Sequence, residues 1–234
     1  MIFPATKAEM KILGWDRCDV IIVSGDAFVD HPSFGPAIIA RVLEAEGYRV
    51  GILDQPDWQN SASAMRLGAP RLCFAVTAGN IDSMVAHYTV NHKKRSDDAY
   101  SEGGKAGRRP NRASIVYTNL VRSAYKDVPV ILGGVEASLR RMAHYDYWTD
   151  KVRRSILIDS KADLLIYGMG ELPVKAVIKQ LDAGTPIREI SDIPGTVCRV
   201  NEIGKNGIEL PSFEAVQKDK NAFNTMTRLH YENR

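Results

Sequence analysis

The residues best suited to chemistry follow three predicted strands, in loops that combine glycine with acidic or imidazole side chains. The first loop runs from Asp26 to Gly35, the second contains Gly133–Gly134, and the third runs from Gly168 to Glu171. Glycine lets a ligand approach the backbone closely, and a helix N-terminus behind such a loop can hold a phosphate. Any one loop alone is also what a tight turn requires, but together they predict a cleft. The residues predicted to bind a cofactor there are Asp26, Asp30, His31, Gly35, Gly133, Gly134, Glu136, Gly168, Gly170 and Glu171.

A second polar segment, between Arg140 and Arg154, is dense in arginines and aromatic rings. Guanidinium groups bind phosphates or carboxylates through paired hydrogen bonds. Two alternatives compete with ligand binding: the arginines can pair internally with Asp and Glu, or they can dock another domain. The residues predicted to contact a substrate or a docked domain are Arg140, Arg141, His144, Tyr145, Arg153 and Arg154.

A polar loop from Asn91 to Ser114 is too long for an ordinary connection, so we expect it to be either functional or mobile. Its basic residues resemble a nucleic-acid-binding loop by composition. Acidic residues interrupt the run, and the net charge of the chain is only +3, so a solvated loop is favoured over a nucleic-acid site. The basic residues concerned are Lys93, Lys94, Arg95, Lys105, Arg108, Arg109 and Arg112.

The sequence shows no reaction machinery. It contains no G-x-S-x-G elbow, no full G-x-G-x-x-G and no P-loop. Cys18, Cys73 and Cys198 are far apart and odd in number, which predicts buried free thiols rather than a zinc or iron–sulfur site. We therefore assign no catalytic residue and no metal ligand in this chain.

The elements that must position these loops alternate between strand and helix. Short apolar runs bounded by polar residues predict strands over 19–25, 48–54, 71–79, 128–134 and 162–171. Amphipathic stretches predict helices over 35–48, 80–90, 114–126 and 172–184. This alternation is typical of an α/β domain with a doubly wound, mainly parallel, Rossmann-like sheet. In such a sheet, ligands bind outside the carboxyl ends of the strands, where the three glycine loops fall.

The chain changes character near residue 200. We predict a domain over 1–200 and an extension over 201–234, with a hairpin around Gly204 to Gly207 and then a short polar helix. The last residues give no stop signal, and we expect them to lead into further sequence. No apolar run is long enough for a membrane span, and the N-terminus lacks the features of a signal peptide, so we expect a cytoplasmic protein.

Two long strings resemble the N-terminal region of the YgiQ family of radical S-adenosylmethionine (SAM) proteins. They are SGDAFVDHPSFGPAIIARVLEAEGYRVGILDQPDW and RRPNRASIVYTNLVRSAYKDVPVILGGVEASLRRMAHYDYWTDKVRRSILIDSKADLLIYGMGE. The resemblance extends from about Trp15 to Lys220. It implies a cobalamin-binding type of Rossmann domain, which precedes a barrel whose C-x-x-x-C-x-x-C motif binds a 4Fe–4S cluster and SAM. This chain contains no such motif, so the resemblance places the cluster in the barrel, the implied partner of this domain.

The resemblance also raises the question of cobalamin, which such domains hold through a D-x-H-x-x-G motif whose histidine binds cobalt. Aligning Asp30 and Gly35 to that pattern puts Pro32 at the ligand position, with His31 one residue early. Histidine ligation in this register is therefore excluded. Cobalamin bound without a protein ligand remains open, as does a domain that keeps the fold without the cofactor. We also expect Asp30 or Ser33 to cap the following helix.

These observations predict a domain that binds or shapes a substrate or cofactor cleft above the barrel, for a substrate that the sequence does not identify. The alternatives are a docking domain without a ligand of its own and a module that binds a nucleic-acid substrate through residues 93–112.

Overall fold

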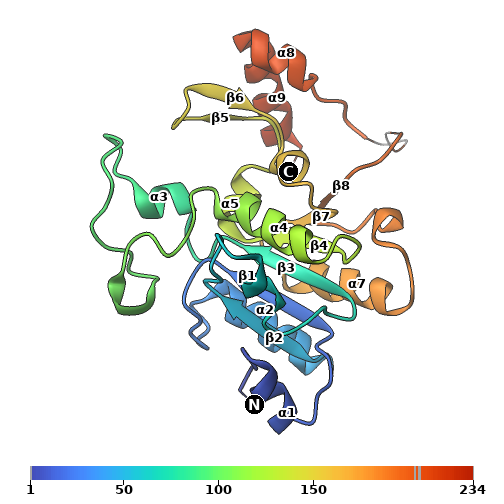
Figure 1. The fold of residues 1–234 in the computed structure, drawn as a ribbon. Coiled ribbons are helices and arrows are strands. Elements are labelled where there is room, and N and C mark those ends of the chain that lie inside the picture. Colours follow the sequence, from blue (N-terminus) through green and yellow to red (C-terminus); the bar gives the residue numbers. More distant parts are fainter. Residues whose placement is uncertain (1, 203, 205–206, 234) are drawn as a thin grey trace.

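The computed structural model describes residues 2–202, 204 and 207–233, and its centre is a six-stranded sheet (Figure 1). The strand order is β2-β1-β3-β4-β7-β8, and every neighbouring pair is parallel except β7–β8. The predicted Rossmann-like, mainly parallel α/β fold is confirmed. The strands are β1 (Val20–Ser24), β2 (Val50–Asp54), β3 (Cys73–Thr77), β4 (Val130–Gly133), β7 (Leu164–Ile166) and β8 (Thr196–Cys198).

The central strands consist of apolar runs because both faces of the sheet are covered. Every residue of β1 is buried, and Val20 pairs in parallel register with Val50 on one side and Cys73 on the other. A strand buried on both faces needs a continuous apolar run instead of an alternating one. This is why these strands could be recognised from the sequence.

Helices cover the two faces in separate layers. Helices α2 (Gly35–Ala45) and α7 (Glu171–Asp182) contact each other and pack on one face. Helices α4 (Ala113–Ala124) and α6 (Ile156–Ser160) pack on the other, with the short 3₁₀ helix η1 (Ser61–Met65). Helix α5 (Gly134–Leu139) follows β4 directly and contacts β7 and β3.

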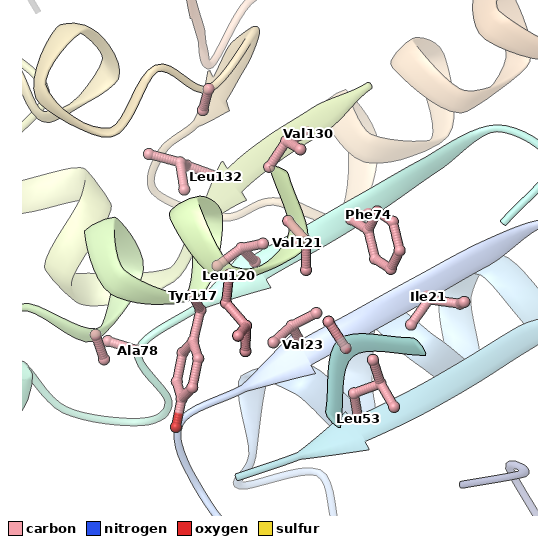
Figure 2. Close-up of a cluster of buried hydrophobic side chains, with 14 of the residues drawn as sticks. Ile21, Val23, Leu53, Phe74, Ala78, Tyr117, Leu120, Val121, Val130 and Leu132 are labelled. Carbon is pink, nitrogen blue, oxygen red and sulfur yellow. The ribbon is translucent and has the colours of Figure 1, made fainter. Parts of the chain in front are cut away.

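The core beneath α4 illustrates how the sheet is sealed. In Figure 2, side chains of β1 to β4 point toward Tyr117, Leu120 and Val121 of α4. Phe74 at the centre of the sheet is fully buried and stacks on Tyr125, with 5.6 Å between the ring centroids. Burying side chains of this size contributes about 1.5–3 kcal/mol each, so this layer fixes α4 firmly.

The chain between β3 and α4 departs most from a regular α/β unit. Helix α3 (Ser83–His87) is shorter than predicted, and Asp82 caps its start by accepting from the Met84 and Val85 N–H groups. Two antiparallel bridges, Tyr88–Lys94 and Asp97–Lys105, and the 3₁₀ turn η2 (Glu102–Gly104) then organise the predicted long loop. Figure 1 shows this segment extending away from the sheet.

The remaining elements lie outside the main sheet and its covering helices. A two-stranded hairpin, β5 (His144–Asp146) with β6 (Lys151–Arg153), occupies the arginine-rich segment. Helices α8 (Phe213–Lys218) and α9 (Lys220–Glu232) lie beyond it (Figure 1), and α8 is the predicted short helix, whereas α9 was not predicted. Smaller pieces are α1 (Lys7–Ile12) and η3 (Ile187–Glu189).

The predicted hairpin after residue 200 falls partly on residues 203, 205 and 206, which lie outside the described residues. Strand β8, just before it, pairs with β7 in the main sheet. The division of the chain at residue 200 stays a prediction. Across the part of the chain that the structure describes, no helix is long and apolar enough to cross a membrane.

Candidate functional site

A cavity of about 450 Å³ opens at the carboxyl edge of the sheet, between the start of α2 and the start of α7. The three glycine-bearing loops predicted to form a cleft do meet here. The predicted site residues that line the cavity are Gly35, Gly133, Gly134, Gly168, Gly170 and Glu171.

The cavity has an apolar interior and a partly exposed apolar mouth. Its interior includes Ile22, Ala75 and Ile131 from three adjacent strands, and helices α2 and α7 add Ile39 and Val174. Ala75 lies in the central strand β3, yet it is only half-buried, because its short side chain leaves the space above the sheet open. The arrangement therefore suits a ligand with an apolar or flat aromatic part.

Two glycines border this cavity for different reasons. Gly134 has φ +83°, and a Cβ on it would overlap the Thr77 Oγ1 atom, so glycine is required by both backbone and space. Gly170 has φ −81°, and its added Cβ would lie 3.4 Å from Ile166 and 3.5 Å from Ile39. A side chain at Gly170 would therefore occupy the cavity without straining the backbone.

Asp26, a predicted cofactor-binding residue, lies behind the cavity in a buried ionic cluster. Its Oδ1 accepts from Arg109 Nη1 at 2.8 Å, and Asp98 accepts from Arg109 Nη2 at 2.8 Å through both oxygens. The side chains of all three residues are at most 1% exposed. Burial raises the pKa of Asp26 to about 6, against the lowering effect of the Asn80 N–H and the Arg109 guanidinium.

Asn80 connects this buried cluster to the mouth of the cavity. Its N–H donates to Asp26 Oδ2 at 2.6 Å, and its Oδ1 accepts from the Gly35 N–H at 3.2 Å. Its Nδ2 donates to the Ser33 carbonyl at 3.1 Å, and Asn80 itself lines the cavity. Asn80 was not among the predicted site residues, although its position directly after Gly79 at the end of a predicted strand was a usable signal.

The predicted capping of α2 by Asp30 or Ser33 is wrong. The N-cap residue is Phe34, whose side chain makes no hydrogen bond to the first turn of α2. Asn80, which is 45 positions away from Gly35, accepts from the helix start instead. Asp30 pairs with Arg41, and this ion pair lowers the pKa of the Asp30 carboxyl.

His31 is exposed, and its Nδ1 accepts from the Ser33 N–H at 3.1 Å. Neither Asp30 nor His31 lines the cavity, so the structure separates them from the glycines with which they were grouped. The sequence register excluded His31 as a cobalt ligand, and in the structure His31 also lies outside the cavity.

Glu136 is buried beside the starts of α3 and α4 and does not line the cavity. One carboxylate oxygen accepts from the Ser83 N–H at 2.9 Å and from the Ser83 hydroxyl at 2.5 Å, and the other accepts from the Ser114 N–H at 2.9 Å. Ser83 begins α3 and Ser114 lies in the first turn of α4, so a single carboxylate satisfies backbone donors of two helix starts. The structure thus gives Glu136 a positioning role.

The arginine-rich segment follows the alternative of internal pairing. Arg140 pairs with Asp82, and Arg153 and Arg154 both pair with Asp159, at 3.2 Å and 2.5 Å. Arg141 donates to the Ser138 carbonyl at 2.6 Å.

Two neighbours of these arginines complete the segment. Tyr145 is exposed and donates to Asp150 at 2.6 Å. The Nδ1 of His144 lies 3.1 Å from the Met142 carbonyl, and its Nε2 is buried without a hydrogen-bond partner among the described residues. Burial lowers the pKa of His144, so its neutral form is favoured.

Arginines of the long basic loop likewise form ion pairs within the protein. Arg109 is buried, and Arg112 pairs with the buried Asp146 of the hairpin at 2.7 Å. Arg108 contacts Glu102 at 3.1 Å, whereas Lys93 and Lys94 are exposed. Composition alone does not distinguish these roles, because a polar run contains the same residue type whether an arginine is buried or exposed.

The described residues do not fit a metal or iron–sulfur centre. Among them, no group of three or more His, Cys, Asp or Glu side chains is arranged to hold a metal ion. Cys18 and Cys73 are buried and Cys198 is half-buried, all as free thiols. Burial raises the pKa of Cys18 to about 11 and also raises the pKa values of Cys73 and Cys198, which disfavours the thiolate that a metal requires.

Comparison with known proteins places these features in a family. Residues 2–234 match the family model described as Radical SAM N-terminal. The chain is 57% identical to a UPF0313 protein of Methanocella arvoryzae, with 97% of the chain and 38% of that protein covered. It is 52% identical to one of Thermotoga neapolitana, with 98% and 40% covered, and 51% identical to one of Bradyrhizobium diazoefficiens, with 98% and 37% covered. The chain thus spans about two fifths of the length of these relatives. No solved structure matches it.

Proposed function

Since this chain belongs to the Radical SAM N-terminal family, we propose that it holds a substrate or cofactor in the cavity at the carboxyl edge of its sheet. The family implies a 4Fe–4S cluster and SAM for full-length proteins. The described residues do not fit the cluster, so its chemistry is assigned to the part of the relatives outside the match.

The cavity is the observation that carries this proposal. Its volume of about 450 Å³ lies within the range of about 300–1,000 Å³ that is usual for small-molecule sites. It lies at the edge of a parallel sheet where such folds bind ligands, and glycines from three loops leave the backbone accessible there. The apolar interior would exclude water from the bound group.

The ligand class that this interior favours is a flat or apolar group, such as the base at the end of the nucleotide tail of cobalamin. Ile22, Ala75 and Gly170 would contact it, and Asn80 and Glu171 would offer polar groups beside it. Histidine ligation of cobalt does not fit, because His31 lies outside the cavity. Cobalamin would therefore be held through its tail, without a protein ligand to the metal.

Titration of the chain with hydroxocobalamin tests this proposal. We expect a change in the visible spectrum and a rise in melting temperature for the unmodified chain and for His31→Ala. Ala75→Trp should lose both responses, because the indole would fill the cavity from the sheet. Ala183→Trp is the matched control, since Ala183 is exposed at the far end of α7 from the cavity, and it should respond like the unmodified chain.

The same variants should be titrated with the fluorescent probe 8-anilinonaphthalene-1-sulfonate, which reports an apolar site of any specificity. Binding of this probe to the unmodified chain and its loss in Ala75→Trp would support a ligand cavity, and a missing cobalamin response would then rule out cobalamin. A chain that binds neither compound, or an Ala75→Trp variant that binds both as before, would overturn the proposal.

A further inference from the structure

Three large apolar side chains at the mouth of the cavity form an exposed surface, which we call the apolar collar. Val135 and Leu139 come from α5, and Met169 comes from the turn after β7; they are 45%, 64% and 82% exposed. All three line the cavity. The Gly168 N–H donates to Ser138 Oγ at 3.3 Å, which holds the two contributing segments together.

The collar continues into the first turn of α7, where Leu172 is 77% exposed. A contiguous apolar patch rarely stays exposed on a monomeric protein and commonly marks an interaction surface. Of the arginines predicted to dock another domain, Arg140, Arg153 and Arg154 form ion pairs within the chain, and Arg154 is still 54% exposed. Recognition by the collar itself would depend on apolar contact.

We infer that the apolar collar is the docking surface for the part of the family's longer proteins that lies outside the match. The matched stretch fills only 37–40% of three relatives, and the family description places it at the N-terminal side of the radical SAM part. A second domain of that size needs a contact surface on this one. The collar is the exposed apolar surface that borders the predicted ligand cavity.

The position of α9 favours this occupant over an unrelated protein. His230, in the last turn of α9, lies 2.7 Å from the Arg141 guanidinium through its Nε2. That guanidinium also stacks over the Tyr167 ring at 4.7 Å, and Tyr167 precedes Gly168 and Met169. In a longer relative, the chain that continues past this helix would therefore start beside the collar.

Docking at the collar would also close the cavity, since the same side chains form its mouth. The inference goes beyond the proposed function, because the collar could dock a domain whether or not the cavity holds a ligand. A variant that fills the cavity and leaves the collar intact separates the two. Ala75→Trp is such a variant, and it should lose the ligand but keep the docking partner.

The experiment uses the full-length Methanocella arvoryzae relative with a protease site introduced after the stretch that matches this chain. We expect the two parts to remain associated in gel filtration after cleavage. A tagged excess of the present chain should then replace the matched part. Leu139→Ser/Met169→Ser should need at least ten times the concentration for the same replacement. Ile2→Ser/Ile12→Ser, which removes two apolar side chains that are 85% exposed elsewhere, should replace it like the unmodified chain.

Several results would overturn the inference. One is a collar variant that exchanges as well as the unmodified chain. Another is an Arg153→Ala/Arg154→Ala variant that no longer exchanges while the collar variant exchanges like the unmodified chain. Separation of the cleaved parts without any capture by this chain would also contradict it. Finally, sedimentation could show a dimer of this chain that dissociates in the collar variant without any docking of the other part, which would assign the collar to a second copy.

Discussion

Arg109 and Asp26 are 83 residues apart in the sequence, yet their side chains form a fully buried ion pair with 2.8 Å between Nη1 and Oδ1. Asp98 shares the same guanidinium, so one cation faces two carboxylates. The pair fixes the end of the long basic loop against the loop that follows β1. Removing one partner would leave uncompensated charge inside the protein.

Arg109→Met should therefore lower the free energy of unfolding by about 3–5 kcal/mol, the usual cost of breaking a buried pair. Urea unfolding followed by circular dichroism measures this directly. The neighbouring Arg108 pairs with an exposed Glu102, so Arg108→Met should cost less than about 1 kcal/mol. Equal effects of the two substitutions would show that the cluster contributes no more than a surface pair.

Asp26 should make stability depend on pH. Its pKa is raised from 3.8 to about 6 by burial, so between these values the folded protein binds the proton more strongly than the unfolded chain does. The free energy of unfolding of the unmodified chain, minus that of Asp26→Asn, should therefore fall as pH rises from about 4 to about 6. The fall should be at most about 1.4 kcal/mol per pH unit, and the difference should stay constant above about pH 6. Urea unfolding at several pH values tests this; a difference that grows with pH would mean that the Arg109 pair outweighs burial.

Glu136→Gln should destabilise the starts of α3 and α4. The carboxylate accepts from Ser83 and Ser114, and the amide would turn an NH₂ group toward donors that need an acceptor. We expect a loss of about 1–3 kcal/mol and faster hydrogen exchange of the Ser83 and Ser114 amides. Glu171→Gln, at a half-buried position on the cavity, is the control, and its exchange at those two amides should be unchanged.

The two glycines at the cavity should respond differently to alanine. Gly134→Ala combines a positive φ with overlap on Thr77, so we expect a loss of more than about 1 kcal/mol in thermal or urea unfolding. Gly170→Ala keeps an ordinary φ and gains contacts with Ile166 and Ile39, and its stability should change by less than about 0.5 kcal/mol. Similar losses for both would refute the distinction between a required glycine and one that only leaves space.

The sheet and the glycine loops could be predicted because their signals are local. A strand such as β1 is an uninterrupted apolar run, and parallel topology then brings the loops before Gly35, Gly134 and Gly170 to one edge. The same reasoning grouped Asp26 and Glu136 with the cleft, because a sequence shows that a carboxylate follows a strand but not which way it points. Their partners, Arg109 and Ser114, are distant in sequence or hidden in polar runs.

Three further features, the cap of α2, the β5–β6 hairpin and helix α9, could not be predicted because the local sequence carries only a weak signal for each. Asn80 takes the capping role expected of Asp30 or Ser33, since tertiary packing brings it to the start of α2. The hairpin of β5 and β6 has only three residues in each strand, too few for a clear alternation. Helix α9 is polar overall, and of its residues Lys220–Glu232 only Met226 is buried, so in the sequence it resembles a solvated segment.

The basic loop is attached to the sheet edge at a few separate points. The Tyr100 carbonyl accepts from the Ala27 N–H at 2.8 Å, Ser101 Oγ accepts from Gln55 at 2.7 Å, and Arg109 is held by Asp26. Lys93 and Lys94 precede these points and Lys105 lies between them, and all three lysines are exposed. Substitutions at these exposed lysines can therefore change the surface charge of the domain while the contacts that attach the loop are kept.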